Sequence, residues 1–102
     1  MEAAIYNYRV WIQNTDPSSL VQLFTDLLET SGFTILNFME HHFSPQGYTA
    51  IWLLAESHLA VHTFPEGAKT YVELSSCDKQ KFDNFLNLSA HQSSFSLIEY
   101  AV

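Results

Sequence analysis

Residues 49–67 read TAIWLLAESHLAVHTFPEG, and this stretch decides the fold because it contains two apolar, β-leaning runs that almost abut. The first run spans Thr49–Glu56 and the second spans His58–Phe64. The turn signal Pro65-Glu66-Gly67 follows, and Lys69–Ser76 is a further run of the same kind. The stretch therefore predicts three consecutive strands joined by short turns.

Upstream of this stretch the sequence predicts two more strands and a helix. Ala3–Gln13 and Phe33–Phe43 are typical of strands, and Ser44-Pro45-Gln46-Gly47 is the turn that closes the second of them. Asp16 followed by Pro17 is typical of a helix start. Apolar residues then recur at helical spacing until Ser31-Gly32 ends the element: Leu20, Val21, Phe24, Leu27 and Leu28.

Downstream, Asp78 is a candidate cap for a second, shorter helix, whose Phe82, Phe85 and Leu86 share one face. Phe95–Ala101 is a candidate final strand. The order β-α-β-β-β-β-α-β predicts an α+β fold, a mainly antiparallel sheet with two helices on one face, as a single domain over residues 1–102.

Two helices on one face leave the other face of the sheet uncovered. We expect aromatic strand residues such as Trp11, Tyr8 and Trp52 to lie on the uncovered face. Packing two sheets face to face would bury such a surface, so we expect a homodimer.

Composition limits the possible partners and the compartment. With 47% apolar residues, the chain is not of a disordered class, and its formal net charge of −7 leaves no basic stripe to bind nucleic acid. The apolar run Ala50–Ala55 is far too short to span a bilayer, and we expect no membrane association and no secretory signal. A single cysteine, Cys77, forms no internal disulfide, which favours a reducing, cytoplasmic location.

The histidines do not predict a metal site. Four of the five histidines lie between residues 41 and 62, but His58 and His62 on a strand are about 13 Å apart, and His41 and His42 point to opposite faces. Taken one by one, the other candidate residues also have ordinary structural roles. Ser57 suits a turn, Cys77 a buried thiol, Phe43 a core aromatic and Glu66 a solvated acid.

The combination of these residues at their spacing is more specific for a function than any one of them alone. Residues 53–66, LLAESHLAVHTFPE, closely resemble the self-processing segment of the short prokaryotic S-adenosylmethionine decarboxylases, which are pyruvoyl-dependent enzymes. The shared pattern is Glu-Ser-His, a histidine five residues after the serine (His62), an aromatic-Pro-Glu turn, and a cysteine twenty residues after the serine (Cys77). Upstream, residues 41–47, HHFSPQG, resemble the family's histidine-containing Phe-x-Pro-x-Gly segment.

The resemblance implies cleavage between Glu56 and Ser57. The Ser57 hydroxyl would attack the Glu56 carbonyl and form an ester, and loss of the Ser57 α-proton would then expel the Glu56 carboxylate. Tautomerisation and hydrolysis of the resulting dehydroalanine leave a pyruvoyl group, the only cofactor expected, with no metal. Such chemistry requires a strained turn, which the abutting runs supply.

The resemblance also implies the other roles. The pyruvoyl group from Ser57 would form a Schiff base with S-adenosylmethionine and act as the electron sink for decarboxylation, which supplies the aminopropyl donor for spermidine. His62 would transfer protons in processing, and Cys77 would return a proton to the substrate. Phe43 would stack on adenine and Glu66 would bind the ribose diol, while Thr49 stands where a family serine supports processing.

Several positions depart from the family pattern, and they leave alternatives open. Gly67-Ala68-Lys69 replaces an aromatic- and glycine-rich turn, and Asp78 follows the cysteine where glycine is usual. A pyruvoyl-dependent decarboxylase of another amino acid, such as arginine or ornithine, needs no adenine platform. A non-enzymatic homologue that serves as a binding module would remain intact at Ser57, so the intact mass of the protein separates it from both enzymes.

Overall fold

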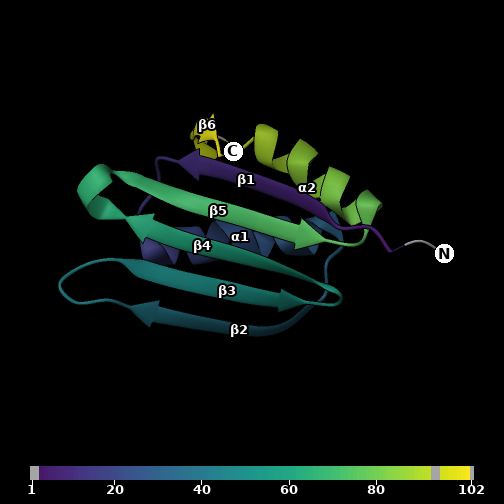
Figure 1. The fold of residues 1–102 in the computed structure, drawn as a ribbon, viewed down its shortest axis with the longest axis horizontal. Coiled ribbons are helices and arrows are strands. Elements are labelled where there is room, and N and C mark those ends of the chain that lie inside the picture. Colours follow the sequence, from purple (N-terminus) through teal and green to yellow (C-terminus); the bar gives the residue numbers. More distant parts are fainter. Residues whose placement is uncertain (1–2, 93–94, 102) are drawn as a thin grey trace.

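A six-stranded antiparallel sheet forms one of the two layers of the molecule (Figure 1). The computed structural model describes residues 3–92 and 95–101. The spatial order of the strands is β2-β3-β4-β5-β1-β6. Their bounds are β1 (Tyr6–Ile12), β2 (Ile35–His42), β3 (Tyr48–Leu54), β4 (Ser57–Phe64), β5 (Lys69–Ser76) and β6 (Leu97–Tyr100).

Two capped helices pack on one face of the sheet. Helix α1 (Pro17–Ser31) begins after Asp16, whose carboxylate accepts a hydrogen bond from the Ser19 amide at 2.9 Å, and ends at Gly32, with φ 102°. Helix α2 (Lys79–Ala90) begins after Asp78, whose carboxylate accepts from the Lys81 amide at 3.1 Å. In Figure 1, α1 lies behind the strands, so the viewer faces the side of the sheet that the helices leave open.

The hydrophobic core lies between the helices and the covered face. Alternate residues of β3 point toward the helices, because successive side chains of a strand point to opposite faces. Trp52 is 1% exposed, and its indole N–H donates to Thr25 Oγ1 of α1 at 3.1 Å. Tyr8 likewise packs edge-on against Phe85 of α2. The expectation that Trp52 and Tyr8 lie on the uncovered face is therefore wrong, since both belong to the alternation that faces the helices.

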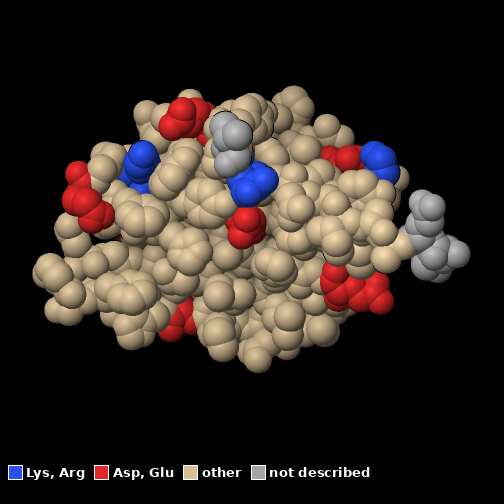
Figure 2. Space-filling model, in the orientation of Figure 1, with Lys and Arg blue, Asp and Glu red and all other residues tan. Residues whose placement is uncertain are grey.

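The open face is largely uncharged. Trp11 lies on it, with its ring against the rings of Phe64 and Tyr71 at centroid distances of 5.8 and 5.3 Å. Figure 2 shows this face, on which uncharged residues cover most of the surface. Phe64 and three further apolar side chains are between 36% and 63% exposed: Met39, Ile51 and Leu53.

The predicted order of elements and the α+β class are confirmed, and the differences are at strand ends. The run predicted to Glu56 stops at Leu54, because Ala55 and Glu56 form the turn between β3 and β4. The predicted strand Phe95–Ala101 shortens to Leu97–Tyr100. Neither helix in the described part of the chain is long and apolar enough to cross a membrane.

Candidate active site

The turn between β3 and β4 holds its second residue in a strained conformation. Leu54 pairs with Ser57 across the hairpin, which leaves Ala55 and Glu56 as the loop. Glu56 has φ 61°, in the left-handed region, where a residue with a side chain is destabilised by roughly 1–3 kcal/mol. The strain therefore falls on the residue whose carbonyl Ser57 would attack.

Ser57 is the first residue of β4, and it is 8% exposed. Its hydroxyl donates to Ser76 Oγ at 2.9 Å, because Ser57 and Ser76 are register partners in β4 and β5. Ser76 Oγ in turn accepts from the Asp78 amide at 3.0 Å. The proton of the Ser57 hydroxyl thus has an acceptor within the same chain.

Cys77 lies beside the Glu56–Ser57 peptide. Its sulfur is 3.3 Å from the Glu56 carbonyl oxygen and 3.4 Å from Oε2 of the Glu56 carboxylate. The hydrogen bond to Glu56 is the largest of the effects that raise the pKa of the Cys77 thiol above its ordinary value. The position therefore carries a protonated sulfur that donates toward the carbonyl of the peptide bond.

His62 occupies the other end of the hairpin. It pairs with Thr49 across β3 and β4, and Thr49 Oγ1 lies 3.0 Å from His62 Nδ1. Its ring also stacks on Tyr71 of β5, with centroids 6.1 Å apart. His62 lies five positions after Ser57 on the strand, which corresponds to about 16 Å, and an odd spacing puts the two side chains on opposite faces. Within one chain, His62 contacts Thr49 and not Ser57.

An open cleft of about 330 Å³ adjoins His62. Phe43, Thr49 and Glu66 line it with residues of β4, and Phe43 is 52% exposed. The amide of Gln46 lies 3.4 Å from Glu66 Oε2. Gly47 has φ 107°, a conformation that residues with a side chain rarely adopt, so glycine allows the loop beside the cleft to turn. A Cβ added at Gly47 would lie 3.6 Å from the Phe43 Cβ. An aromatic face, a histidine and a carboxylate thus border one opening.

The structure separates the sequence-predicted residues into two groups. Glu56, Ser57 and Cys77 form the turn group, while Phe43, Thr49, His62 and Glu66 form the cleft group. Sequence reasoning missed Ser76, although counting outward from the Pro65–Gly67 turn pairs it with Ser57. It also missed the contact of the Glu56 carboxylate with Cys77, for which the sequence carries no signal.

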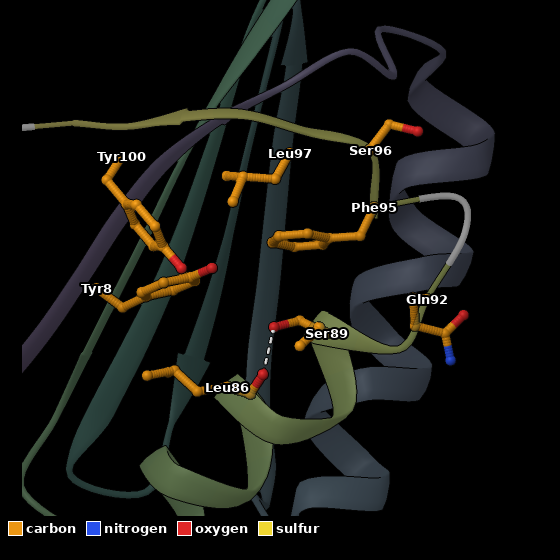
Figure 3. A pocket seen from close by; sticks show the side chains of 9 residues that line it. Tyr8, Leu86, Ser89, Gln92, Phe95, Ser96, Leu97 and Tyr100 are labelled. Carbon is orange, nitrogen blue, oxygen red and sulfur yellow. Dashed lines mark hydrogen bonds between the residues drawn. The ribbon is translucent and has the colours of Figure 1, made fainter.

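A larger cavity of about 400 Å³ lies elsewhere, between α2, β1 and β6 (Figure 3). The rings of Tyr8 and Tyr100 line one side of it in edge-to-face contact, with centroids 6.0 Å apart, and Ser89 Oγ donates to the Leu86 carbonyl at 3.0 Å. None of its described lining residues is charged, and none belongs to the turn or cleft groups. Among residues 3–92 and 95–101, no three His, Cys, Asp or Glu side chains are grouped as metal ligands require.

The sequence and the fold are similar to those of known proteins. The S-adenosylmethionine decarboxylase family profile matches residues 12–99. An S-adenosylmethionine decarboxylase proenzyme of Prochlorococcus marinus (strain MIT 9313) is 42% identical over 65 residues, which are 64% of this chain and 52% of the relative. A protein of the same name from Methanococcus maripaludis (strain C7) is 32% identical over 62 residues, 61% of this chain and 51% of the relative.

The chain spans about half the length of the curated relatives it matches. In three dimensions it is similar to the crystal structure of the adenosylmethionine decarboxylase from Aquifex aeolicus VF5, with a TM-score of 0.71 at 20% identity. That similarity covers 85% of this chain and 78% of the other, and it shows a shared fold.

Proposed function

The chain belongs to the S-adenosylmethionine decarboxylase family, and we propose that it is a self-processing, pyruvoyl-dependent decarboxylase of S-adenosylmethionine. Its product would be the aminopropyl donor of polyamine biosynthesis, and a cytoplasmic location is part of the proposal. The observation that carries it is the turn group, in which a strained Glu56 precedes a hydrogen-bonded Ser57 and a thiol lies 3.3 Å from the carbonyl to be attacked.

Cleavage begins at the Glu56 carbonyl. Ser57 Oγ adds to the carbonyl carbon while its proton passes toward Ser76, and the Cys77 thiol donates to the oxygen on which negative charge develops. The C–N bond then breaks as the Ser57 nitrogen takes up the proton that Oγ released, which leaves an ester between Glu56 and Ser57 Oγ and a free amino group on Ser57. Relief of the φ 61° conformation favours this step.

Elimination of the ester completes cleavage of the chain into two fragments. Loss of the Ser57 α-proton expels Glu56 as a carboxylate and leaves a dehydroalanine at residue 57. This enamine tautomerises to an imine, and water replaces the imine nitrogen, so that ammonia leaves and a ketone remains. The chain thus becomes fragments 1–56 and 57–102, without any external cofactor.

A pyruvoyl group supplies a ketone that condenses with an amine and withdraws electrons from the carbon that loses carbon dioxide. Residue 57 begins β4, and the Cys77 sulfur lies 3.3 Å from the carbonyl oxygen of the residue before it, which supports Cys77 as the proton donor to a carbon held at position 57. The cleft group suits the nucleoside part of the substrate, with the exposed Phe43 ring as a face for adenine and Glu66 as an acceptor for ribose hydroxyls.

The separation of the two groups favours a homodimer. Within one chain about 16 Å separates His62 from Ser57, whereas two open faces that pack with antiparallel strands bring the His62 end of one copy to the turn end of the other. There His62 would act on the Glu56–Ser57 peptide from the open face and not directly on the Ser57 hydroxyl, which points to the covered face. Such packing brings the cleft group of one copy over the turn group of the other. It also buries Met39, Ile51, Leu53 and Phe64, and a stable interface requires roughly 800 Å² per partner.

Intact mass tests the proposal. Purified protein should resolve into fragments 1–56 and 57–102, with the second blocked to N-terminal sequencing, and Ser57→Ala should stay full length. A wild-type chain that remains whole after long incubation, with no carbonyl reactive toward hydroxylamine, would overturn the pyruvoyl assignment.

A further inference from the structure

The Glu56 side chain makes a contact that cleavage at its own carbonyl does not require. Cys77 Sγ lies 3.3 Å from the backbone oxygen of Glu56 and 3.4 Å from Oε2 of its carboxylate, so two oxygens of one residue face the same sulfur. The register of β4 and β5 fixes this arrangement. Ser57 pairs with Ser76, and Cys77 is therefore the residue that lies beside the turn.

The Glu56 carboxylate has no competing cation among the ion pairs of residues 3–92 and 95–101. Those pairs join His42 to Glu40, Lys79 to Asp83 and Lys81 to Asp78. Glu56 has a left-handed backbone conformation, and its carbonyl and carboxylate oxygens lie 3.3 and 3.4 Å from the same sulfur. The carboxylate of the described structure thus accepts from a thiol rather than from a lysine or an arginine.

The carboxylates that act on the Cys77 sulfur all disfavour the thiolate form. Glu56, from the β3–β4 turn, and Asp78, at the start of α2, both raise the pKa of the Cys77 thiol, and Glu56 has the larger effect. The next residue, Lys79, does not offset them, because its ammonium lies 2.8 Å from Asp83. A thiolate at this position would face two carboxylates.

We propose that Glu56 is a positioning residue for Cys77: its carboxylate shares the single S–H hydrogen bond with the Glu56 carbonyl oxygen and keeps the sulfur protonated beside the Glu56–Ser57 peptide. The inference rests on the proposed function, in which this sulfur acts as a proton donor. A protonated thiol donates to the carbonyl oxygen and later to carbon, whereas a thiolate does neither. The thiolate is also the form that attacks electrophiles, so Glu56 protects the site from alkylation.

The test measures the thiol directly, in protein that does not cleave. Cys77 is the only cysteine of the chain, so alkylation by iodoacetamide reports on it alone. The rate is measured against pH in Ser57→Ala protein and in Ser57→Ala/Glu56→Gln protein, because glutamine has the length of glutamate and no charge. We expect the alkylation midpoint to move to lower pH in the glutamine variant, with a rate at pH 8 roughly threefold or more above that of the parent.

Two matched variants define the effect. Asp78→Asn keeps an N-cap for α2 and should move the midpoint less than Glu56→Gln, whereas Glu99→Gln should not move it, because Glu99 is on the edge strand β6 opposite Trp11, at the other end of β1 from the partner of Ser76. Glu56→Asp withdraws the carboxylate by one methylene, and we expect a midpoint between those of glutamate and glutamine.

The outcomes separate this inference from the proposed function. A midpoint that stays in place or rises in Glu56→Gln overturns the positioning role, even if wild-type protein cleaves and decarboxylates. If thermal unfolding shows that Glu56→Gln does not fold, the folded Glu56→Asp protein decides by the same criterion. A wild-type chain that never cleaves overturns the proposed function, whatever the alkylation profile of Cys77.

Discussion

The two ends of the β3–β4 hairpin differ in how completely their polar groups are engaged. At the turn, Ser57 is buried and donates to Ser76, while Cys77 lies against Glu56. At the other end, Phe43 and Glu66 are exposed around a cleft of about 330 Å³. Under the proposed function, the turn acts on its own backbone and the cleft admits a ligand, so that neither end alone is a complete site.

The largest expected effect tests the division between the turn group and the cleft group by co-expressing two variants that are each inactive alone. His62→Ala should slow cleavage and turnover by about 10²–10⁴-fold, the usual contribution of a positioned general acid or base. Co-expression with Ser57→Ala should restore cleavage of the His62→Ala chain alone, because its turn group then meets an intact cleft group. Intact mass of differently tagged chains measures this result.

A matched pair controls for nonspecific rescue. Ser57→Ala and Cys77→Ala both alter the turn group, so every turn group in a dimer of these two chains lacks either Ser57 or Cys77. Co-expression of this pair should therefore not restore decarboxylation. If the His62→Ala and Ser57→Ala mixture stays as inactive as each variant alone, His62 does not act across the interface.

The two tryptophans compare the faces of the sheet. Trp52→Ala removes a ring that is 1% exposed and donates to Thr25, and it should lower the free energy of unfolding by about 3–5 kcal/mol. Trp11→Ala removes a ring of the open face and should weaken dimerisation instead. Denaturant unfolding measures the first effect and sedimentation at several concentrations measures the second. A Trp11→Ala protein that dimerises as tightly as wild type would count against this interface.

Phe43 tests what the cleft binds. Phe43→Ala should raise KM for S-adenosylmethionine about 10- to 100-fold, because base stacking on an aromatic side chain contributes about 1–3 kcal/mol. Phe43→Leu keeps an apolar side chain without the flat face and should recover little. Steady-state carbon dioxide release provides the measurement, with arginine and ornithine as parallel substrates. An unchanged KM for S-adenosylmethionine would remove Phe43 from its site.

Local signals were sufficient to predict the elements. Asp16 and Asp78 were identified as helix caps because a carboxylate before a helical pattern satisfies free backbone N–H groups, and both make those bonds. Which face of the sheet a side chain occupies was harder to predict. An aromatic residue such as Tyr8 or Trp52 fits a strand equally well whether its side chain faces a helix or solvent. Only the alternation along each strand, together with the position of the helices, decides between the two.

The candidate site was predictable as a set of residues but not as an arrangement. The family resemblance identified Ser57, His62 and Cys77 together, and the odd spacing of Ser57 and His62 on one strand already implied opposite faces. The contact of the Glu56 carboxylate with Cys77 depends on the φ of one turn residue and on the β4–β5 register, which are properties of the folded chain.

The smallest expected effect concerns Thr49, the partner of His62 at the cleft end. Thr49 Oγ1 lies 3.0 Å from His62 Nδ1, and a hydrogen bond to one ring nitrogen fixes which nitrogen carries the proton. Thr49→Val keeps the shape without the hydroxyl and should slow cleavage about fivefold, as loss of about 1 kcal/mol implies. Thr49→Ser keeps the hydroxyl and should cleave at least as fast as wild type. The time course of intact mass after cell-free synthesis measures both rates. If Thr49 acts through His62, adding Thr49→Val to His62→Ala causes no further slowing, whereas additive losses would assign Thr49 a role independent of the histidine.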